Sequence, residues 1–304
     1  MNKSTPAYKG RFAPSPTGDL HFGSLIAAVG SYLEAKSKNG QWLVRIEDVD
    51  QTRTIPQSDK KILSTLEHFG FEWDGEVVYQ SQRTALYEAY LDQLSSNQLT
   101  YPCDCSRSKL KQTEDNDTLP GVYPRYCRKR DKPVTTPYAI RCLTNPGKIS
   151  FYDQIQGLFS VNLEKECGDF IIKRRDGFIA YHLAVVADDA EQGITDIVRG
   201  ADLLSSTPQH LYLQQQLGLA QPSYSHLPVA MHDNGQKLSK SHQDLAIQYC
   251  SPVKLISSAL EFLNQSPPQS LHNATLDEFW HWAVLNWDLN KVTKSREIRF
   301  NLPD

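Results

Sequence analysis

The chain has 304 residues, of which 39% are hydrophobic and 22% charged, enough to bury a sizeable core in two or three domains. It contains no run of 18 apolar residues and no apolar stretch near its start, so we expect a cytoplasmic protein without a membrane partner. The formal net charge of -3 argues against a basic surface overall, so any contact with nucleic acid is expected at local patches such as CRKRDK at 127–132.

The first predicted elements form a strand–helix–strand unit. Residues 8–13 predict a short strand, and apolar residues recurring every four positions from 25 to 33 predict a helix that ends before Gly40. The apolar run 42–46 then predicts a buried parallel strand whose carboxyl end carries charged residues. We therefore expect an α/β fold with a ligand crevice at this edge of the sheet.

The loop between the first strand and the helix lies within RFAPSPTGDLHFGSL, residues 11–25. It faces the amino terminus of the helix, where N–H groups and the helix dipole favour phosphate. Gly18 and Gly23 allow close backbone approach, and His21 could donate to a phosphate oxygen as negative charge develops. An ordinary proline- and glycine-rich turn with a surface histidine would explain the same residues, so a second signal is needed.

Three of the six cysteines, Cys103, Cys105 and Cys127, lie within 25 residues. In a chain expected in the cytoplasm, this clustering favours a metal over a disulfide. Three thiolates suit tetrahedral zinc, which needs a fourth ligand, and no histidine lies nearby. The spacing alone supports zinc and free buried thiols equally.

The second phosphate signal is NGQKLSKSH, residues 234–242. Asn-Gly predicts a hairpin turn that places Lys237 and Lys240, with serines beside them, in a short loop. Two lysines among hydroxyl groups suit a triphosphate clamp, although this motif alone would also fit a solvated basic loop. Combined with the loop over 200 residues upstream, it indicates a nucleotide site.

At these residues the sequence resembles the class I aminoacyl-tRNA synthetases, and in particular their glutamyl and glutaminyl branch. HFGS at 21–24 and KLSKS at 237–241 are similar to the two signature motifs of the class. The resemblance continues in the same order through RIEDVDQTR (45–53), YQSQR (79–83) and VRGADLLSSTPQH (198–210). It implies a Rossmann-type parallel sheet, split by an inserted zinc-containing α/β module and followed by a short helical C-terminal region.

The expected division follows from this resemblance. Residues 1–100 and 179–236 would form the two halves of the catalytic domain, and 101–178 the inserted, acceptor-binding-like module. Residues 237–304 would hold the lysine loop and a helical region similar to a stem-contact domain, without an anticodon-binding domain. We expect the tryptophans of this tail to pack a core rather than to stack on bases: Trp280, Trp282 and Trp287.

Length separates the members of this branch. An ordinary glutamyl-tRNA synthetase continues with a large anticodon-binding region, whereas 63 residues follow Ser241 here. The short chain and the cysteine cluster together resemble the glutamyl-queuosine tRNA(Asp) synthetases, a family of truncated paralogues. That resemblance implies a monomeric ligase that activates L-glutamate with ATP and Mg²⁺, without tRNA, and transfers it to the queuosine base at the wobble position of tRNA(Asp). The alternatives are a truncated synthetase that charges a terminal adenosine and a non-catalytic, synthetase-like regulator.

The resemblance also assigns residues. Glutamate carries two carboxylates and one ammonium group, so its site should hold arginine and an acid. Implied for glutamate binding are Arg11, Ala13, Ser15, Glu47, Tyr181 and Arg199. Implied for ATP binding are His21, Gly23, Asp202 and Lys240, with His21, Lys237 and Lys240 as catalytic residues. Implied for structural zinc are Cys103, Cys105, Tyr123 and Cys127, with Asp104 or water in place of Tyr123 as the fallback.

Overall fold

The computed structural model describes residues 7–106, 108, 119, 122–129, 134–232, 235, 236, 247 and 251–300. The chain begins with β1 (Lys9–Phe12), α1 (Phe22–Ser37) and β2 (Gln41–Ile46), and the two strands pair in parallel. The strand–helix–strand prediction is confirmed. The apolar residues whose spacing predicted the helix, Leu25, Val29 and Leu33, are all buried in α1.

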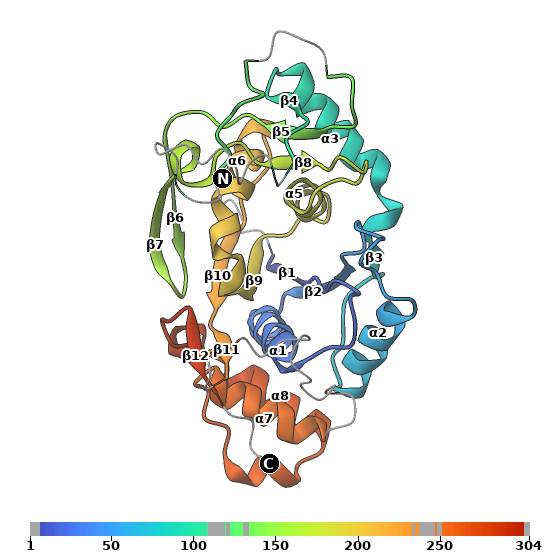
Figure 1. Cartoon of the computed structure of the whole chain (residues 1–304). Helices are drawn as coiled ribbons and strands as arrows, with labels where there is room; N and C mark the ends of the chain where they lie inside the picture. The colour runs from blue at the N-terminus through green and yellow to red at the C-terminus, as the bar shows by residue number, and fades with distance from the viewer. Residues whose placement is uncertain are drawn as a thin grey trace, which may run out of the picture.

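A largely parallel sheet runs through the centre of the molecule (Figure 1). Thr195 joins its two halves, because its N–H donates to the Lys9 carbonyl at 3.0 Å and its Oγ1 accepts from the Lys9 N–H at 2.9 Å. The sheet therefore grows in opposite directions from β1, and a crevice is expected where the order reverses. The strands on one side of β1 are β2 and β3 (Val78–Tyr79); those on the other are β9 (Asp196–Gly200), β10 (Ser223–Leu227), β6 (Lys148–Asp153) and the antiparallel edge strand β7 (Gly157–Asn162).

Helices cover both faces of this sheet. Figure 1 shows α1 and α5 (Tyr181–Glu191) end-on, on opposite sides of β1 and β2. Each face has its own apolar core, one formed around α1 and the other around α5. The α/β fold with a parallel sheet is therefore confirmed. Packed on the α1 side are α7 (Pro252–Phe262) and α8 (Leu276–Asn286), and on the α5 side are α3 (Thr84–Ser96) and α6 (Thr207–Leu217).

Residues between β3 and α5 contribute to two sheets. A separate antiparallel sheet contains β4 (Thr100–Cys103), β5 (Ala139–Cys142) and β8 (Ile171–Lys173). Between β5 and β8 the chain forms the β6–β7 hairpin and the π-helical turn η2 (Leu163–Cys167), and β6 pairs with β10 of the main sheet. This pairing brings Asp153, at the end of β6, into the interior of the molecule.

The C-terminal region packs under α1. Trp280 is 7% exposed, and its Nε1 donates to the Phe69 carbonyl at 2.9 Å, so the expectation that it packs in a core is confirmed. No described helix is long and apolar enough to cross a membrane. The remaining elements are α2 (Ser58–His68), β11 (Val229–Met231), β12 (Glu297–Arg299) and the short 3-10 helices η1 (Gln80–Gln82), η3 (Ala201–Ser206), η6 (Gln269–Asn273) and η7 (Leu289–Lys291).

Candidate active site

A cavity of about 490 Å³ opens at the carboxyl ends of β1, β2, β9 and β10. The predicted glutamate- and ATP-site residues that fall in the described part of the chain all line it: Arg11, Ala13, Ser15, His21, Gly23, Glu47, Tyr181, Arg199 and Asp202. The crevice expected at the edge of the sheet therefore exists and gathers these side chains. The other two predicted residues, Lys237 and Lys240, lie outside the described residues.

His21 is the N-cap residue of α1, and its Nδ1 accepts from the Ser24 N–H at 3.3 Å. In a neutral ring with this bond the proton sits on Nε2, which lies 3.2 Å from Ser24 Oγ. Gly23 and the first turn of the 16-residue α1 lie at the same wall of the cavity. This wall has the features of a phosphate site, because it combines a histidine donor with the N–H groups of a helix amino terminus.

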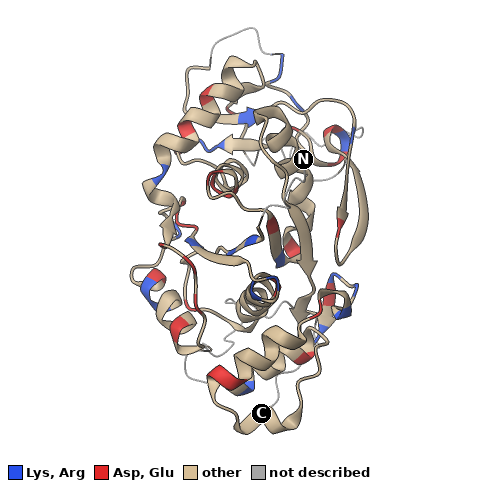
Figure 2. Ribbon diagram, turned by 180° about the vertical axis from the view of Figure 1, so that it is seen from behind, with Lys and Arg blue, Asp and Glu red and all other residues tan. Residues whose placement is uncertain are grey.

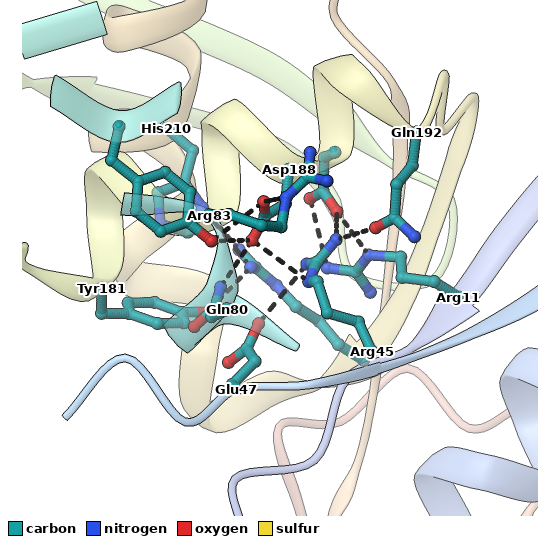
Figure 3. Close-up of polar contacts among 12 residues, drawn as sticks. Arg11, Arg45, Glu47, Gln80, Arg83, Tyr181, Asp188, Gln192 and His210 are labelled. Carbon is teal, nitrogen blue, oxygen red and sulfur yellow. Dashed lines mark hydrogen bonds and ion pairs between the residues drawn. The ribbon is translucent and has the colours of Figure 1, made fainter. Parts of the chain in front are cut away.

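The opposite wall rests on a buried network of charges (Figure 3). Asp189 accepts from Arg11 Nε at 3.0 Å and lies 2.9 Å from Arg45 Nη1. Burial disfavours the charged form of Asp189, but the two guanidinium groups outweigh it and lower the pKa of this carboxyl. Figure 2 shows the same arrangement at lower magnification, with basic stretches of β1 and β2 facing the acidic part of α5.

Asp188, the neighbouring residue on α5, anchors a second part of this network. It is fully buried and accepts from Arg83 Nε at 2.7 Å, Gln80 Nε2 at 2.8 Å and Tyr87 Oη at 2.9 Å. Its carboxylate also lies 3.7 Å from Arg45 Nε. Each of these charges therefore has an opposite charge beside it, and the network joins α5 to β2 and η1.

Glu47 follows β2 directly and offers an acid to the cavity. Its Oε1 lies 3.4 Å from Arg45 Nη2. Burial raises the pKa of Glu47, whereas Arg45 and Arg11 act in the opposite direction. A cation bound in the cavity would favour the ionised carboxylate, so this position suits an ammonium group.

Arg199, on β9, has different surroundings. Its side chain is buried, yet it forms no ion pair with any described carboxylate. Its N–H groups reach neutral acceptors: His226 Nε2 at 3.0 Å, Thr207 Oγ1 at 2.9 Å and Tyr181 Oη at 3.3 Å. A buried positive charge with neutral partners beside a cavity suits an anionic ligand.

The cysteine cluster lies in a different place, at the end of β4. The sulfur atoms of Cys103, Cys105 and Cys127 lie within 4.8 Å of one another, and Tyr123 Oη lies 3.3 Å from Cys103 Sγ. Three sulfurs and one oxygen form a donor set that fits tetrahedral zinc. The fallback ligand is also close, since Asp104 Oδ1 lies 3.6 Å from Cys127 Sγ.

Comparison with known proteins identifies the family. Residues 8–254 match the model of the class I tRNA synthetases (E and Q), catalytic domain. A glutamyl-Q tRNA(Asp) synthetase of Ectopseudomonas mendocina is 48% identical over 96% of this chain and 97% of its own length. This chain belongs to the glutamyl-Q tRNA(Asp) synthetase family. A second glutamyl-Q tRNA(Asp) synthetase, from Chromobacterium violaceum, is also 48% identical, over 95% of this chain and 96% of its own.

A solved structure supports the same grouping. The glutamate-tRNA synthetase from Elizabethkingia anophelis superposes with a TM-score of 0.79 at 29% identity, covering 97% of this chain and 68% of that one. The class I synthetase domain and the relatives' names indicate a ligase-type enzyme, so the predictions of a class I α/β fold and of the enzyme class are confirmed.

Sequence reasoning missed several residues of this site. Arg45 lies within the RIEDVDQTR motif, and Asp188 and Asp189 follow the predicted site residue Tyr181 in YHLAVVADD. Charged residues in apolar runs were the available signal, because a charge is seldom buried without a partner. Nothing in the sequence marked His226 or its partner Asp153.

Proposed function

We propose that this protein activates L-glutamate with ATP, without tRNA, and transfers the glutamyl group to the queuosine base at the wobble position of tRNA(Asp). The names of the relatives support these substrates. The observation that carries the proposal is one cavity in which Arg199 has neutral partners, Glu47 offers an acid and His21 caps α1. Glutamate presents carboxylates and an ammonium group that complement the first two, and ATP presents phosphates that suit the third.

In the first step an oxygen of the α-carboxylate attacks the α-phosphorus of ATP. The bond to the bridging oxygen breaks, and pyrophosphate leaves with the electron pair. No bond to the protein forms, so catalysis depends on positioning and on stabilising negative charge. In the second step a nucleophile on queuosine attacks the glutamyl carbonyl carbon, and AMP leaves.

The lining residues would bind glutamate at one end of the cavity and ATP at the other. Arg11 and Arg199 would hold carboxylates, Glu47 the ammonium group, and Ala13, Ser15 and Tyr181 would border the amino acid. At the other end, His21 and the amino-terminal N–H groups of α1 would stabilise charge on the phosphates, which carry Mg²⁺. Gly23 would let ATP approach the backbone, and Asp202 would contact its ribose. Lys237 and Lys240 would bind the triphosphate.

The test is transfer of labelled glutamate, with ATP, to tRNA(Asp) carrying or lacking queuosine. A matched substrate, queuosine-containing tRNA(Asp) with its terminal adenosine removed, distinguishes the two possible attachment points. We expect equal labelling of the intact and shortened queuosine tRNAs and none of the queuosine-free tRNA. Label that requires the terminal adenosine would assign ordinary aminoacylation instead, and absence of both label and glutamate-dependent pyrophosphate exchange would contradict enzymatic activity.

We also infer a structural zinc ion held by Cys103, Cys105, Tyr123 and Cys127. The gathered sulfurs and the neighbouring phenol support it. All four ligands would come from the protein, so no position is left for substrate and the metal would stabilise the fold.

Metal content per chain tests the zinc site. The protein should contain one zinc ion, and Cys127→Ser should lose it, whereas Cys142→Ser should retain it because Cys142 lies in β5 outside the cluster. Tyr123→Phe separates the two candidate fourth ligands. Faster release of zinc to a chelator would support the phenol, and unchanged release would favour Asp104 or water.

The oligomeric state, the cellular location and the domain division of the enzyme belong to the same proposal. A monomeric state belongs to the proposal as part of the family resemblance. ATP and tRNA(Asp) as substrates support a cytoplasmic location. The separate β4–β5–β8 sheet supports an inserted module between the catalytic halves 1–100 and 179–236. The proposed bounds of this module, 101–178, also include the β6–β7 hairpin, which pairs with the main sheet, and 237–304 would form the helical tail.

A further inference from the structure

Arg199 is held by a histidine that is itself held by a buried aspartate. His226, on β10, is fully buried; its Nε2 lies 3.0 Å from Arg199 Nε, and its Nδ1 lies 2.6 Å from Asp153 Oδ2. An arginine Nε can only donate, so His226 Nε2 must accept. The ring proton therefore sits on Nδ1, which donates it to Asp153, and the two contacts fix one tautomer.

Asp153 is fixed just as firmly at the end of β6. Its Oδ1 accepts from the N–H groups of His226 at 3.1 Å, Ile155 at 3.0 Å and Gln156 at 2.8 Å. Burial opposes ionisation of Asp153, but these bonds and His226 outweigh it and lower its pKa. Burial also lowers the pKa of His226 to about 4, so a neutral imidazole lies between an anion and a cation.

We propose that Asp153 and His226 are positioning residues of the amino-acid site, which orient Arg199 through an imidazole of fixed tautomer. The inference rests on the proposed function, in which Arg199 binds a carboxylate of glutamate. A carboxylate placed directly against Arg199 would compete with that ligand, as a close ion pair neutralises the guanidinium. The interposed imidazole fixes the direction of the guanidinium while keeping the anion one ring away.

Asp153→Asn tests the proposal because it removes a charge and changes almost no shape. The three N–H groups around Oδ1 would retain the amide oxygen, so the amide NH₂ would take the place of Oδ2 and donate to His226 Nδ1. The ring proton would then move to Nε2 and face the Arg199 Nε–H, donor against donor. We expect the KM for glutamate in pyrophosphate exchange to rise about tenfold or more, with the KM for ATP within about twofold of wild type.

Two substitutions of His226 separate its contacts. His226→Gln places an amide near the position of Nε2 and can still accept from Arg199, whereas His226→Asn places it near Nδ1 and loses Arg199. We therefore expect the glutamate KM of H226Q to lie closer to wild type than that of H226N. The control is Asp74→Asn, because Asp74 bonds Lys36 Nζ at 2.9 Å and the Trp42 N–H at 2.8 Å away from the cavity. It should change stability but neither KM.

Nitrogen-15 NMR of the histidine rings provides a readout that does not depend on activity. His226 should carry its proton on Nδ1 in the wild-type protein and on Nε2 in D153N. A wild-type ring protonated on Nε2, or an unchanged glutamate KM in both D153N and H226N, would overturn the proposal. A wild-type protein without glutamate-dependent exchange would refute the proposed function instead, and the NMR result would still decide whether His226 presents an acceptor to Arg199.

Discussion

The two arginines of the cavity are buried to the same degree but held in opposite ways. Arg11 is 4% exposed and pairs with Asp189, whereas Arg199 is 5% exposed and contacts neutral groups such as His226. Withdrawing a guanidinium from water costs free energy. For Arg11 the Asp189 carboxylate offsets this cost, whereas for Arg199 hydrogen bonds to neutral groups offset it only in part. Arg11 therefore joins elements of the fold as well as facing the cavity, whereas the charge of Arg199 has no carboxylate partner among the described residues and is left for a ligand.

The largest expected effect comes from the arginine with neutral partners. Arg199→Gln should lower kcat/KM for glutamate in pyrophosphate exchange about 10³-fold, equivalent to about 4 kcal/mol, because the ligand carboxylate loses its buried cationic partner. Arg199→Lys is the matched control. Its kcat/KM should lie between those of wild type and R199Q, since lysine keeps the charge but lacks the planar guanidinium. If R199Q left glutamate-dependent pyrophosphate exchange unchanged, Arg199 would not be the partner of the ligand carboxylate, and the proposed difference between Arg11 and Arg199 would be wrong.

On the paired side the main effect should fall on stability. Asp189→Asn leaves the Arg11 and Arg45 guanidinium groups buried without this carboxylate, and we expect the free energy of unfolding in urea to fall by about 3 kcal/mol. D74N serves again as control, because Lys36 and Asp74 are partly exposed and their pair contributes less. A fall no larger in D189N than in D74N would show that the buried pairs do not stabilise the fold.

Acid should lower the stability of the protein through groups near Arg199 and through the Arg11–Asp189 pair in different pH ranges. Burial and Arg199 lower the pKa of His182 to about 4, from 6.5 in the unfolded chain. Between these values the unfolded state binds more protons, so stability falls as the pH decreases from 6.5 towards 4. Asp189 has a lowered pKa, so its contribution is lost only on further acidification, below its unfolded value of 3.8.

A variant isolates the histidine part of this profile. His182→Asn should unfold with a shallower dependence on pH between 6.5 and 4, removing about 2 kcal/mol of the wild-type loss at pH 5. The measurement is a series of urea unfolding curves at fixed ionic strength. Parallel profiles for wild type and H182N would mean that His182 does not titrate in this range.

The sequence predicted the features that depend on local patterns of apolar and charged residues. The α1 helix followed from Leu25, Val29 and Leu33, and the cavity edge from charged residues at the ends of apolar runs. Pairing between distant segments was not accessible. Asp153 meets His226 only because β6 pairs with β10, and no periodicity in residues 148–153 distinguishes that pairing from a strand within a separate module.

The charge network escaped prediction for a related reason. Arg45 and Asp189 lie far apart in the chain, and although each is a charge in or after an apolar run, neither run indicates its partner. Their contact depends on how α5 packs over β2, which composition does not determine. Motif resemblance therefore located the ligand-facing side chains, whereas the groups that hold them required the folded structure.

The smallest expected effect lies at the outer edge of the paired side. Arg83→Gln removes a guanidinium that is 23% exposed, and Asp188 would keep its bonds from Gln80 and Tyr87 and its proximity to Arg45. We expect a loss of about 1 kcal/mol in unfolding free energy and an unchanged glutamate KM. Tyr87→Phe is the matched change at the same carboxylate and should cost a similar amount. If R83Q instead cost as much as D189N, the three remaining donors would not suffice for Asp188, and stability on this side would depend on every pair rather than on the Arg11–Asp189–Arg45 centre.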